Sequence, residues 1–284
     1  MADVEPESMN YERKRSPGGL YYSAILKNKR FKATNFLKRA HQEKQLFVLF
    51  KIFLRSLQLG LYMPLLFIFK KMPFWEEFVF SRLNKLGKAI CKIAKVKLHI
   101  INIENVSKNE TYLFASNHLS LLDIPVLSAA IPVKNKFIAN RELTSFFVTK
   151  LLITFGESLM IDISERKGQI KALKDIRQSL LRGNNLVIFP ESDMSYNGNL
   201  QRFHRGGLSA AVFADVHILP VCIKGTRKVC PPGAFSFKFN RNVYVMFGKA
   251  IDCKNLNRED KKNINIIVYN KLKKLSEEST FSSK

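Results

Sequence analysis

A histidine and an aspartate stand five residues apart in the stretch SNHLSLLDIP, residues 116–125. On a continuous helix two residues at this spacing lie about 140° apart, so their side chains would not meet. If His118 lies in a turn and the helix starts near Ser120, the carboxylate of Asp123 folds back to the imidazole. The carboxylate then orients the ring and stabilises its protonated form, while the other ring nitrogen takes a proton from a substrate hydroxyl. The pair therefore predicts acid–base chemistry on an alcohol.

The spacing alone is weak evidence, because His99 and Glu104 share it. That pair falls in a predicted strand, residues 97–104, where positions i and i+5 point to opposite faces. By contrast, His118 follows the apolar segment TYLFAS, a predicted buried strand, and functional groups gather beyond the carboxyl ends of such strands. Asn117, just before it, suits an unusual backbone conformation or a helix cap. We therefore select His118 and Asp123 as the catalytic pair.

Strands and helices alternate along the rest of the chain, which predicts an α/β fold with a mixed, mostly parallel sheet flanked by helices. A helix is expected at residues 75–95, before the strand at 97–104. The later strands are expected at residues 111–115, 136–139, 158–163, 185–189, 217–223 and 242–248. The later helices are expected at residues 121–131, 143–154, 165–182, 205–214 and 258–277.

The chain is strongly basic, with a formal net charge of +24 over 284 residues. Such an excess favours an anionic partner: nucleic acid, an anionic membrane or an acidic substrate. The four cysteines form no C-x-x-C pair, and none stands beside a histidine at zinc spacing. They are therefore predicted to be reduced packing thiols in a protein that faces the cytosol, and no metal site is expected.

The amino-terminal part favours the membrane among these partners. Residues 1–40 are predicted to be a mobile basic tail, and their spread of charges excludes a signal peptide. Residues 46–71 are almost wholly apolar except for Lys51 and Arg55, which share one face of a helix. Nucleic acid is not expected as a partner of so apolar a segment.

The longest uncharged stretch, residues 56–69, is shorter than the ~18–20 residues of a spanning helix, and Pro64 interrupts it. We therefore expect residues 41–95 to be membrane-associated helices that lie in the interface of an anionic bilayer. A hairpin that dips into one leaflet fits equally well, and a buried core helix is the alternative. The expected location is the cytoplasmic face of a membrane, in contact with its lipids.

The block N-H-L-S-L-L-D resembles the N-H-x-x-x-x-D block of the glycerolipid acyltransferases, the lysophosphatidate acyltransferase family. Further resemblances follow in family order across residues 95–250. They lie at residues 139–143 (ANREL), 156–162 (GESLMID), 189–192 (FPES), 203–207 (FHRGG) and 218–223 (ILPVCI).

The resemblance implies an acyltransferase domain at residues 96–284 that moves a fatty acyl group from an acyl thioester to a lysophospholipid hydroxyl. The best candidate acceptor is 1-acylglycerol-3-phosphate, which would give phosphatidate. Acyl-CoA and acyl carrier protein both fit as the co-substrate, and no cofactor is implied. Substrate-binding roles are implied for Asn117, Arg141, Glu142, Asp162, Arg166, Glu191, Arg202, Arg205, Gly206 and Pro220, the last as the residue that shapes a loop beside the site.

The sequence departs from the family where arginines of these blocks are implicated in holding the acceptor's phosphate. No arginine follows Asp162 directly, Asp193 and Met194 replace Thr-Arg, and Asn140 replaces a lysine. Methionine cannot replace the bidentate contact that arginine makes with phosphate. The charge then comes from other residues, for which the candidates are Arg166, Arg202, Arg205 and Lys224.

Alternatively, the acceptor carries another head group, as in other lysophospholipids or an amine-bearing lipid. A non-catalytic membrane-binding protein on the same scaffold is a further reading of these departures. A thioesterase, with water as the acceptor, is the remaining enzymatic alternative.

Overall fold

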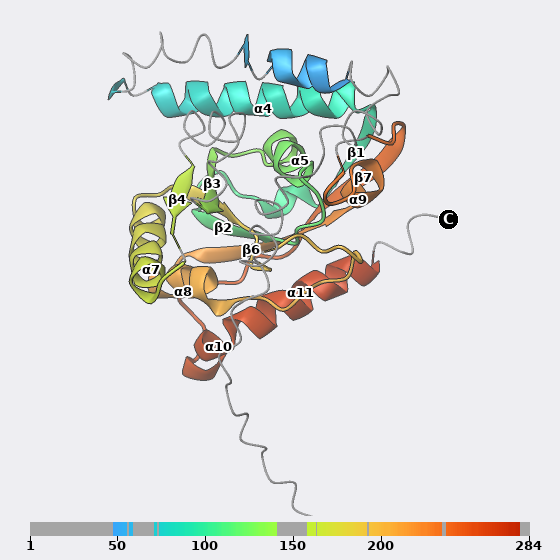
Figure 1. The fold of residues 1–284 in the computed structure, drawn as a ribbon. Helices are drawn as coiled ribbons and strands as arrows, with labels where there is room; N and C mark the ends of the chain where they lie inside the picture. The colour runs from blue at the N-terminus through green and yellow to red at the C-terminus, as the bar shows by residue number, and fades with distance from the viewer. Residues whose placement is uncertain are drawn as a thin grey trace, which may run out of the picture. The chain divides into compact units, whose positions relative to one another are not determined.

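A seven-stranded sheet organises the part of the chain that the structure describes (Figure 1). The computed structural model describes residues 48–55, 57–58, 71–72, 74–140, 158–162, 164–191, 193–234 and 237–278. The strands are β1 (Val96–Ile101), β2 (Tyr112–Ser116), β3 (Asn135–Asn140), β4 (Leu159–Ile161), β5 (Asn185–Ile188), β6 (His217–Lys224) and β7 (Arg241–Phe247).

The strand order is β1-β7-β6-β2-β5-β3-β4. All neighbours pair in parallel except β6 and β7, which are antiparallel. The predicted mixed, mostly parallel sheet is therefore confirmed. Because β2, β5 and β6 are adjacent and parallel, the segments that follow them, which begin at Asn117, Phe189 and Gly225, leave the same edge of the sheet.

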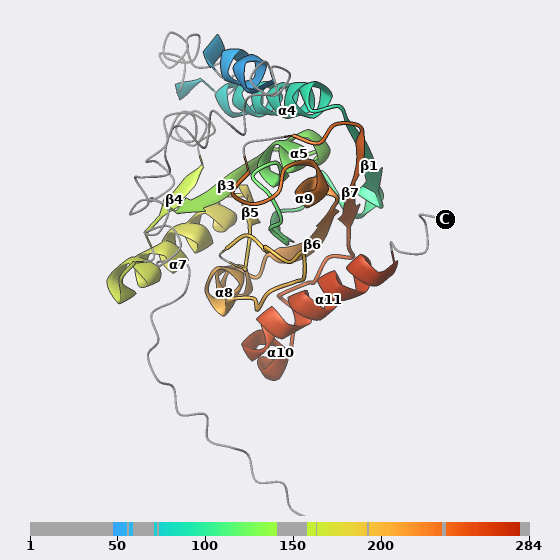
Figure 2. The ribbon, with the colours of Figure 1, turned by 45° about the vertical axis from the view of Figure 1, so that its right-hand side comes forward.

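Helices cover both faces of this sheet, as Figures 1 and 2 show. The helices are α4 (Trp75–Ile93), α5 (Asp123–Ala130), α7 (Arg166–Leu181), α8 (Arg205–Phe213), α9 (Thr226–Val229), α10 (Arg258–Lys262) and α11 (Ile264–Glu278). Buried residues of α4, α5 and α9 form one apolar cluster with one side of the strands. Those of α7, α8 and α11 form the second cluster on the other side. The fully buried β2 contributes to both, which explains its run of apolar residues.

Most predicted elements are present, with shifts that have local causes. The predicted strand 97–104 ends at Ile101, because Asn102 adopts a left-handed conformation (φ 57°) and a 3₁₀ turn, Ile103–Asn105, follows. Glu104 therefore lies outside the strand that holds His99. The single helix expected at 258–277 is divided into α10 and α11 at Asn263, and α9 occupies a stretch where no element was predicted. The helix expected at 143–154 lies outside the described residues.

Residues 48–55 and 57–58 are helical, and Val48 is buried in the same cluster as Leu86 and Ile90 of α4. Phe50, Phe53 and Leu54 instead expose 54%, 42% and 43% of their surface, a high share for such large apolar side chains. None of the helices within the described ranges combines the length and the apolar character needed to cross a bilayer. The predicted tail and most of the apolar segment, residues 59–70, fall outside those ranges.

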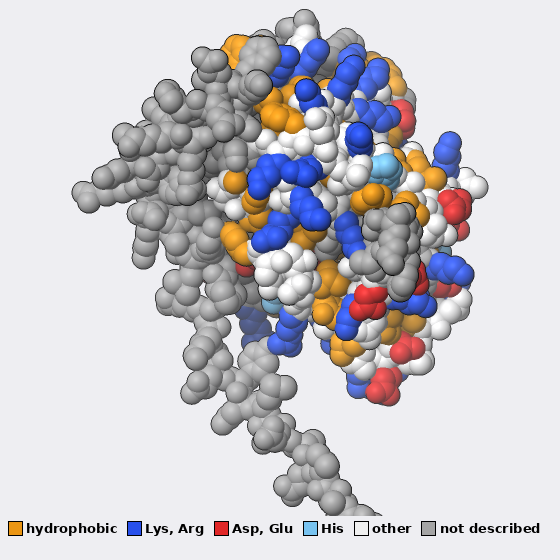
Figure 3. All heavy atoms as spheres, turned by 90° about the vertical axis from the view of Figure 1, so that its right-hand side faces the viewer, with side chains coloured by type: hydrophobic (Ala, Val, Ile, Leu, Met, Phe, Trp, Pro, Cys, Tyr) orange, Lys and Arg blue, Asp and Glu red, His pale blue; other side chains and the backbone are white. Residues whose placement is uncertain are grey.

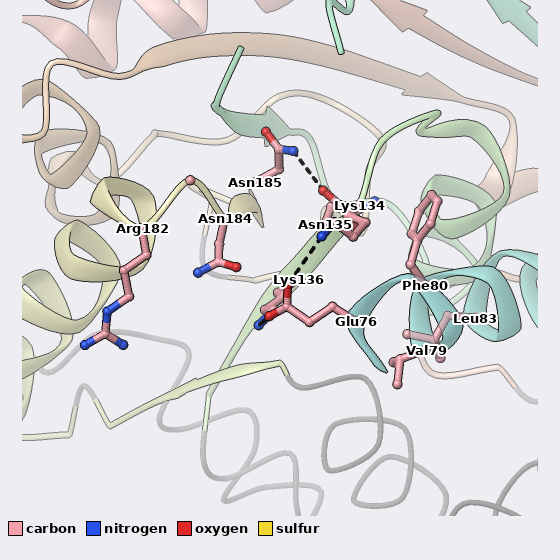
Figure 4. A pocket seen from close by; sticks show the side chains of 11 residues that line it. Glu76, Val79, Phe80, Leu83, Lys134, Asn135, Lys136, Arg182, Asn184 and Asn185 are labelled. Carbon is pink, nitrogen blue, oxygen red and sulfur yellow. Dashed lines mark hydrogen bonds and ion pairs between the residues drawn. The ribbon is translucent and has the colours of Figure 1, made fainter. Parts of the chain in front are cut away.

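The amino end of α4 is fixed to β3 by charges. Glu76 accepts hydrogen bonds from Lys136 at 3.0 Å and from Lys134 at 3.4 Å, and these lysines hold the pKa of Glu76 below its usual value (Figure 4). The three side chains line a cavity of about 130 Å³, together with Asn135 and Asn185, the first residues of β3 and β5. This cavity therefore lies at the amino ends of the strands, away from the edge that carries His118.

A close crossing of α4 and α5 places the helix that carries Asp123. A Cβ atom added at Gly87 would lie 2.5 Å from the carbonyl oxygen of Pro125 and 3.0 Å from the amide nitrogen of Ala129. Both are backbone atoms, so a side chain at this position has to move one whole helix. Glycine is therefore required in α4 at this crossing.

We expect Gly87→Ala to lower the free energy of unfolding by about 1–3 kcal/mol, because it overpacks this crossing. The matched control is Gly206→Ala in α8, where an added Cβ would meet no atom within 4 Å. That control should change the free energy of unfolding by less than about 0.5 kcal/mol in either direction. Urea denaturation of both variants measures the difference, and equal effects would contradict the role of Gly87.

Candidate active site

One carboxylate oxygen organises the turn between β2 and α5. Oδ2 of Asp123 accepts hydrogen bonds from the backbone amides of Leu119 at 2.6 Å and Ser120 at 2.9 Å. The same oxygen lies 2.9 Å from Nδ1 of His118. The side chain of Asp123 is fully buried and that of His118 is 15% exposed. The predicted pair therefore meets, and Asp123 is the first residue of the helix rather than a residue within it.

The imidazole of His118 is held on a second side by an aromatic ring. Phe189, which follows β5, stacks on it with the ring centroids 4.1 Å apart and the planes at 18°. The contact with Asp123 places the proton of the neutral ring on Nδ1, so that Nε2 is the basic nitrogen. Among the described residues Nε2 has no hydrogen-bond partner. It is thus available to a substrate.

Glu191 joins the segments that follow β2 and β5. Its Oε1 accepts the amide of His118 at 3.0 Å, and its Oε2 accepts the amide of Gln201 at 2.9 Å. Burial raises the pKa of Glu191 to about 7, although both amides and His118 oppose this shift. Because both oxygens bind backbone, Glu191 fixes the position of the catalytic turn, whereas the resemblance implied a substrate contact.

The side chain of Asn117 also forms hydrogen bonds with the backbone. Its amide group donates to the carbonyl of Ile223 at 3.0 Å and accepts from the amide of Ile223 at 2.7 Å, so it continues the pairing of β2 with β6. Ser120 donates its hydroxyl to the carbonyl of Cys230 at 2.6 Å, immediately after α9. The catalytic turn is therefore bound to β6 at one end and to α9 at the other.

A loop after Glu191 closes the site on a third side. The amide of Ser195 donates to the carbonyl of His118 at 2.8 Å. The buried hydroxyl of Ser195 donates to the carbonyl of Asn199 at 2.6 Å and accepts the amide of Gly198 at 3.1 Å. The side chain of Ser195 thus holds the fold of the loop at residues 195–199, and the amide of Ser195 fastens the loop to His118.

The other predicted substrate-binding residues are more dispersed. Asp162 follows β4, which β5 and β3 separate from β2, and its Oδ1 accepts the amide and the hydroxyl of Ser164 at 3.1 and 2.6 Å. Arg166 begins α7 and is exposed. Arg141 and Glu142 lie outside the described residues, so their predicted roles stay predictions.

Arg202, Arg205 and Gly206 lie between Gln201 and the first turn of α8. Arg202 and Arg205 are exposed, and Arg205 Nη2 lies 3.5 Å from the carbonyl of Lys261 in α10. The space around Gly206 is open. These residues lie next to the segment that Glu191 holds, but their described contacts do not reach His118.

From the sequence, Pro220 was expected to shape a loop beside the site. It lies instead inside β6 and is buried. It pairs in register with Ala115 of β2, and its carbonyl accepts the amide of Gly248 at 2.8 Å. The ladder between β6 and β7 begins at the next residue, Val221, so the missing N–H of proline costs no bond to β7.

Ser120, Phe189 and Ser195 were not among the predicted site residues. The aromatic FPES stretch was a signal for Phe189, but stacking on a residue 71 positions away leaves no periodic pattern in a sequence. For metals, the described residues contain no group of three or more His, Cys, Asp or Glu side chains placed to hold an ion.

Comparison with known proteins supports the chemistry of this turn. Residues 97–224 match the model of the family described as Acyltransferase. A chloroplastic 1-acyl-sn-glycerol-3-phosphate acyltransferase of Arabidopsis thaliana is 30% identical over 172 residues, which cover 59% of this chain and 47% of that protein. A probable 1-acyl-sn-glycerol-3-phosphate acyltransferase of Mycoplasma pneumoniae is 27% identical over 199 residues, which cover 66% and 74%.

The chain spans about half the length of the plant and algal relatives that it matches. The crystal structure of the 1-acyl-sn-glycerophosphate acyltransferase PlsC from Thermotoga maritima shares the fold, with a TM-score of 0.60 and 23% identity. That similarity covers 79% of this chain and 98% of the bacterial one. The match to the acyltransferase family model, residues 97–224, includes the histidine–aspartate turn and both strands beside it.

Proposed function

We propose that the chain transfers a fatty acyl group from an acyl thioester to the free hydroxyl of 1-acylglycerol-3-phosphate, which gives phosphatidate. The observation that carries this proposal is the contact of 2.9 Å between His118 Nδ1 and Asp123 Oδ2, with Nε2 left available. The likeness to proteins named for this reaction supports the choice of acceptor.

In the proposed reaction, Nε2 of His118 takes the proton of the acceptor hydroxyl while the oxygen attacks the thioester carbonyl carbon. Asp123 stabilises the imidazolium that forms. The tetrahedral oxyanion then collapses, the C–S bond breaks, and the imidazolium returns the proton to the departing thiolate. The products are the ester and the free thiol, so the reaction needs no metal and no acyl-enzyme. Acyl-CoA and acyl carrier protein remain equivalent as donors.

We also propose that the enzyme works on an anionic membrane surface. Lys85, Lys88 and Lys92 share one face of α4, because they are three and four residues apart, and Lys95 and Lys97 follow them. All five are exposed, and no ion pair involves them in the described part of the chain. Figure 3 shows Lys and Arg side chains gathered over the upper part of the face that carries β1, β7 and α9.

Exposed apolar side chains lie at the other end of α4. Phe74, just before α4, exposes 57% of its surface and Met72 exposes 49%, in addition to the exposed phenylalanines of residues 48–55. Cations and large exposed apolar side chains together are the combination with which proteins bind the interface of anionic bilayers. Such a position gives the catalytic turn access to lipid acceptors, and it supports the cytoplasmic face of a membrane as the location.

His118→Ala should lower kcat by at least about 100-fold, because it removes the general base. The matched control is His204→Ala: His204 precedes α8, its side chain is exposed, and it makes no capping hydrogen bond. The control should retain near wild-type activity. The assay measures ester formation from a radiolabelled acyl thioester and 1-acylglycerol-3-phosphate in vesicles, and full activity of His118→Ala would refute the mechanism.

Glu191 should make the protein less stable as the pH rises. Its pKa is about 7 in the folded protein and 4.5 as an ordinary carboxyl group. Between these values the folded protein keeps a proton that the unfolded chain releases, so a rise in pH favours unfolding. We expect the stability of the wild type, relative to Glu191→Gln, to fall by up to about 1.4 kcal/mol per pH unit between pH 4.5 and 7. Denaturant unfolding across this range tests this, and a constant difference would contradict it.

Replacing Lys85, Lys88 and Lys92 together by glutamine should weaken binding to anionic vesicles by about 100-fold, since each lysine near such a surface contributes about 1 kcal/mol. The control replaces Lys271 and Lys273, two exposed lysines of α11 on the opposite side of the sheet. Sedimentation with phosphatidylcholine vesicles, with and without phosphatidylserine, measures both sets. Losses that are equal per lysine replaced in both sets would show that net charge, and not the lysines of α4, governs binding.

A further inference from the structure

We infer that Arg227 binds the phosphate of the acceptor lipid and thereby sets the preference for a charged head group. This inference rests on the proposed acyl transfer. In 1-acylglycerol-3-phosphate the phosphate and the free hydroxyl are on neighbouring carbons of glycerol. A cation that holds the phosphate must therefore lie at the edge of the site that contains His118.

Residues 193–199, which include the loop fastened to His118, supply no such cation. They include Asp193 and Met194, of which the first repels an anion and the second cannot bind one. The buried acidic side chains beside this turn, Asp123 and Glu191, offer no positive charge either. Recognition of a phosphate thus depends on a cation outside residues 193–199.

Three of the four cations considered from the sequence, all except Arg202, have contacts or positions away from His118. Lys224, the last residue of β6, donates its ammonium group to the carbonyl of Ser276 near the end of α11. The guanidinium of Arg205 lies against the carbonyl of Lys261 in α10. Arg166 begins α7, which follows β4, two strands beyond the neighbour of β2. None of these described contacts leads toward His118.

Arg227 reaches the site because short bonds on both sides of it hold α9 to the catalytic turn. Ile223, four residues before it, is paired with the amide group of Asn117, and Cys230, three residues after it, accepts the hydroxyl of Ser120. Gly225 starts the helix in a left-handed conformation (φ 94°), and a Cβ there would lie 2.3 Å from the carbonyl of Asn242. The position of α9 is therefore tightly defined.

The side chain of Arg227 lies against the loop that is fastened to His118. A Cβ atom added at Gly198 would be 3.7 Å from both Cδ and Nη1 of Arg227. Gly198 belongs to the loop whose Ser195 amide binds the carbonyl of His118. Arg227 therefore stands at the junction of α9 and this loop, the two segments that border the catalytic turn.

The charge of Arg227 is exposed and uncompensated. No ion pair or hydrogen bond engages its guanidinium in the parts of the chain that the structure describes. Its planar fork of N–H donors matches two oxygens of a phosphate, which a lysine cannot reproduce. Lys228, the next residue, is also exposed on the same short helix. It provides a neighbour of equal charge for comparison.

The test is steady-state kinetics of the full chain in vesicles, with 1-acylglycerol-3-phosphate and with monoacylglycerol, the same acceptor without the phosphate. Arg227→Gln should raise the KM for the phosphorylated acceptor about tenfold or more, with kcat, the KM of the donor and turnover of monoacylglycerol unchanged. Arg227→Lys should recover part of the loss. Lys228→Gln should leave all of these values near those of the wild type.

Three results would overturn the inference: an unchanged acceptor KM in Arg227→Gln, an equal rise in Lys228→Gln, or a rise in the donor KM instead. The second would indicate a general effect of surface charge, and the third would assign Arg227 to the phosphates of the donor. Failure of the wild type to acylate any acceptor would instead refute the proposed function. Thermal unfolding of each variant verifies that the fold is retained.

Discussion

The contact on which the site depends is made by Oδ2 of Asp123, which binds His118 and the backbone amides of Leu119 and Ser120. The two amides lie in the turn before α5, and Asp123 is the first residue of that helix, so the carboxylate fixes the turn and orients the imidazole with the same atom. A buried carboxylate is tolerated only with such partners. The start of α5 and the orientation of the imidazole therefore depend on the same oxygen atom, so a change at Asp123 alters both.

The sheet turns this local contact into a rigid site. The strands on both sides of β2 each deliver a group to the catalytic turn: β5 leads to Phe189 and Glu191, and β6 pairs with Asn117 through Ile223. Glu191 is buried between two amides, and this burial raises its pKa. Its two oxygens hold the amides of both segments at once. The base is thus positioned by backbone contacts on adjacent parallel strands.

The parts of this arrangement that could be predicted are those encoded locally. Alternation of apolar segments predicted the order of strands and helices, and the turn between β2 and α5 predicted the meeting of His118 and Asp123. The roles of Glu191 and Asn117 could not be predicted, since each depends on a backbone partner that only the strand order brings near. Pro220 was assigned to a loop for the same reason: its tolerance inside β6 depends on where pairing with β7 begins. Asn263 divides the last helix without a proline or glycine to mark it.

Buried and exposed parts of the site are under different physical constraints. Asp123, Glu191 and Ser120 are buried and hydrogen-bonded to backbone, so replacing any one of them leaves an unpaired polar group, which is costly. A phosphate-binding cation has no such constraint, because an exposed side chain needs only to reach the correct point from any neighbouring segment. Loss of a cation from the loop with Asp193 and Met194 is therefore compatible with retained chemistry, provided that a segment such as α9 brings a charge to the same edge. The proposed head-group contact is therefore open to cations of several segments, whereas buried contacts fix the position of His118.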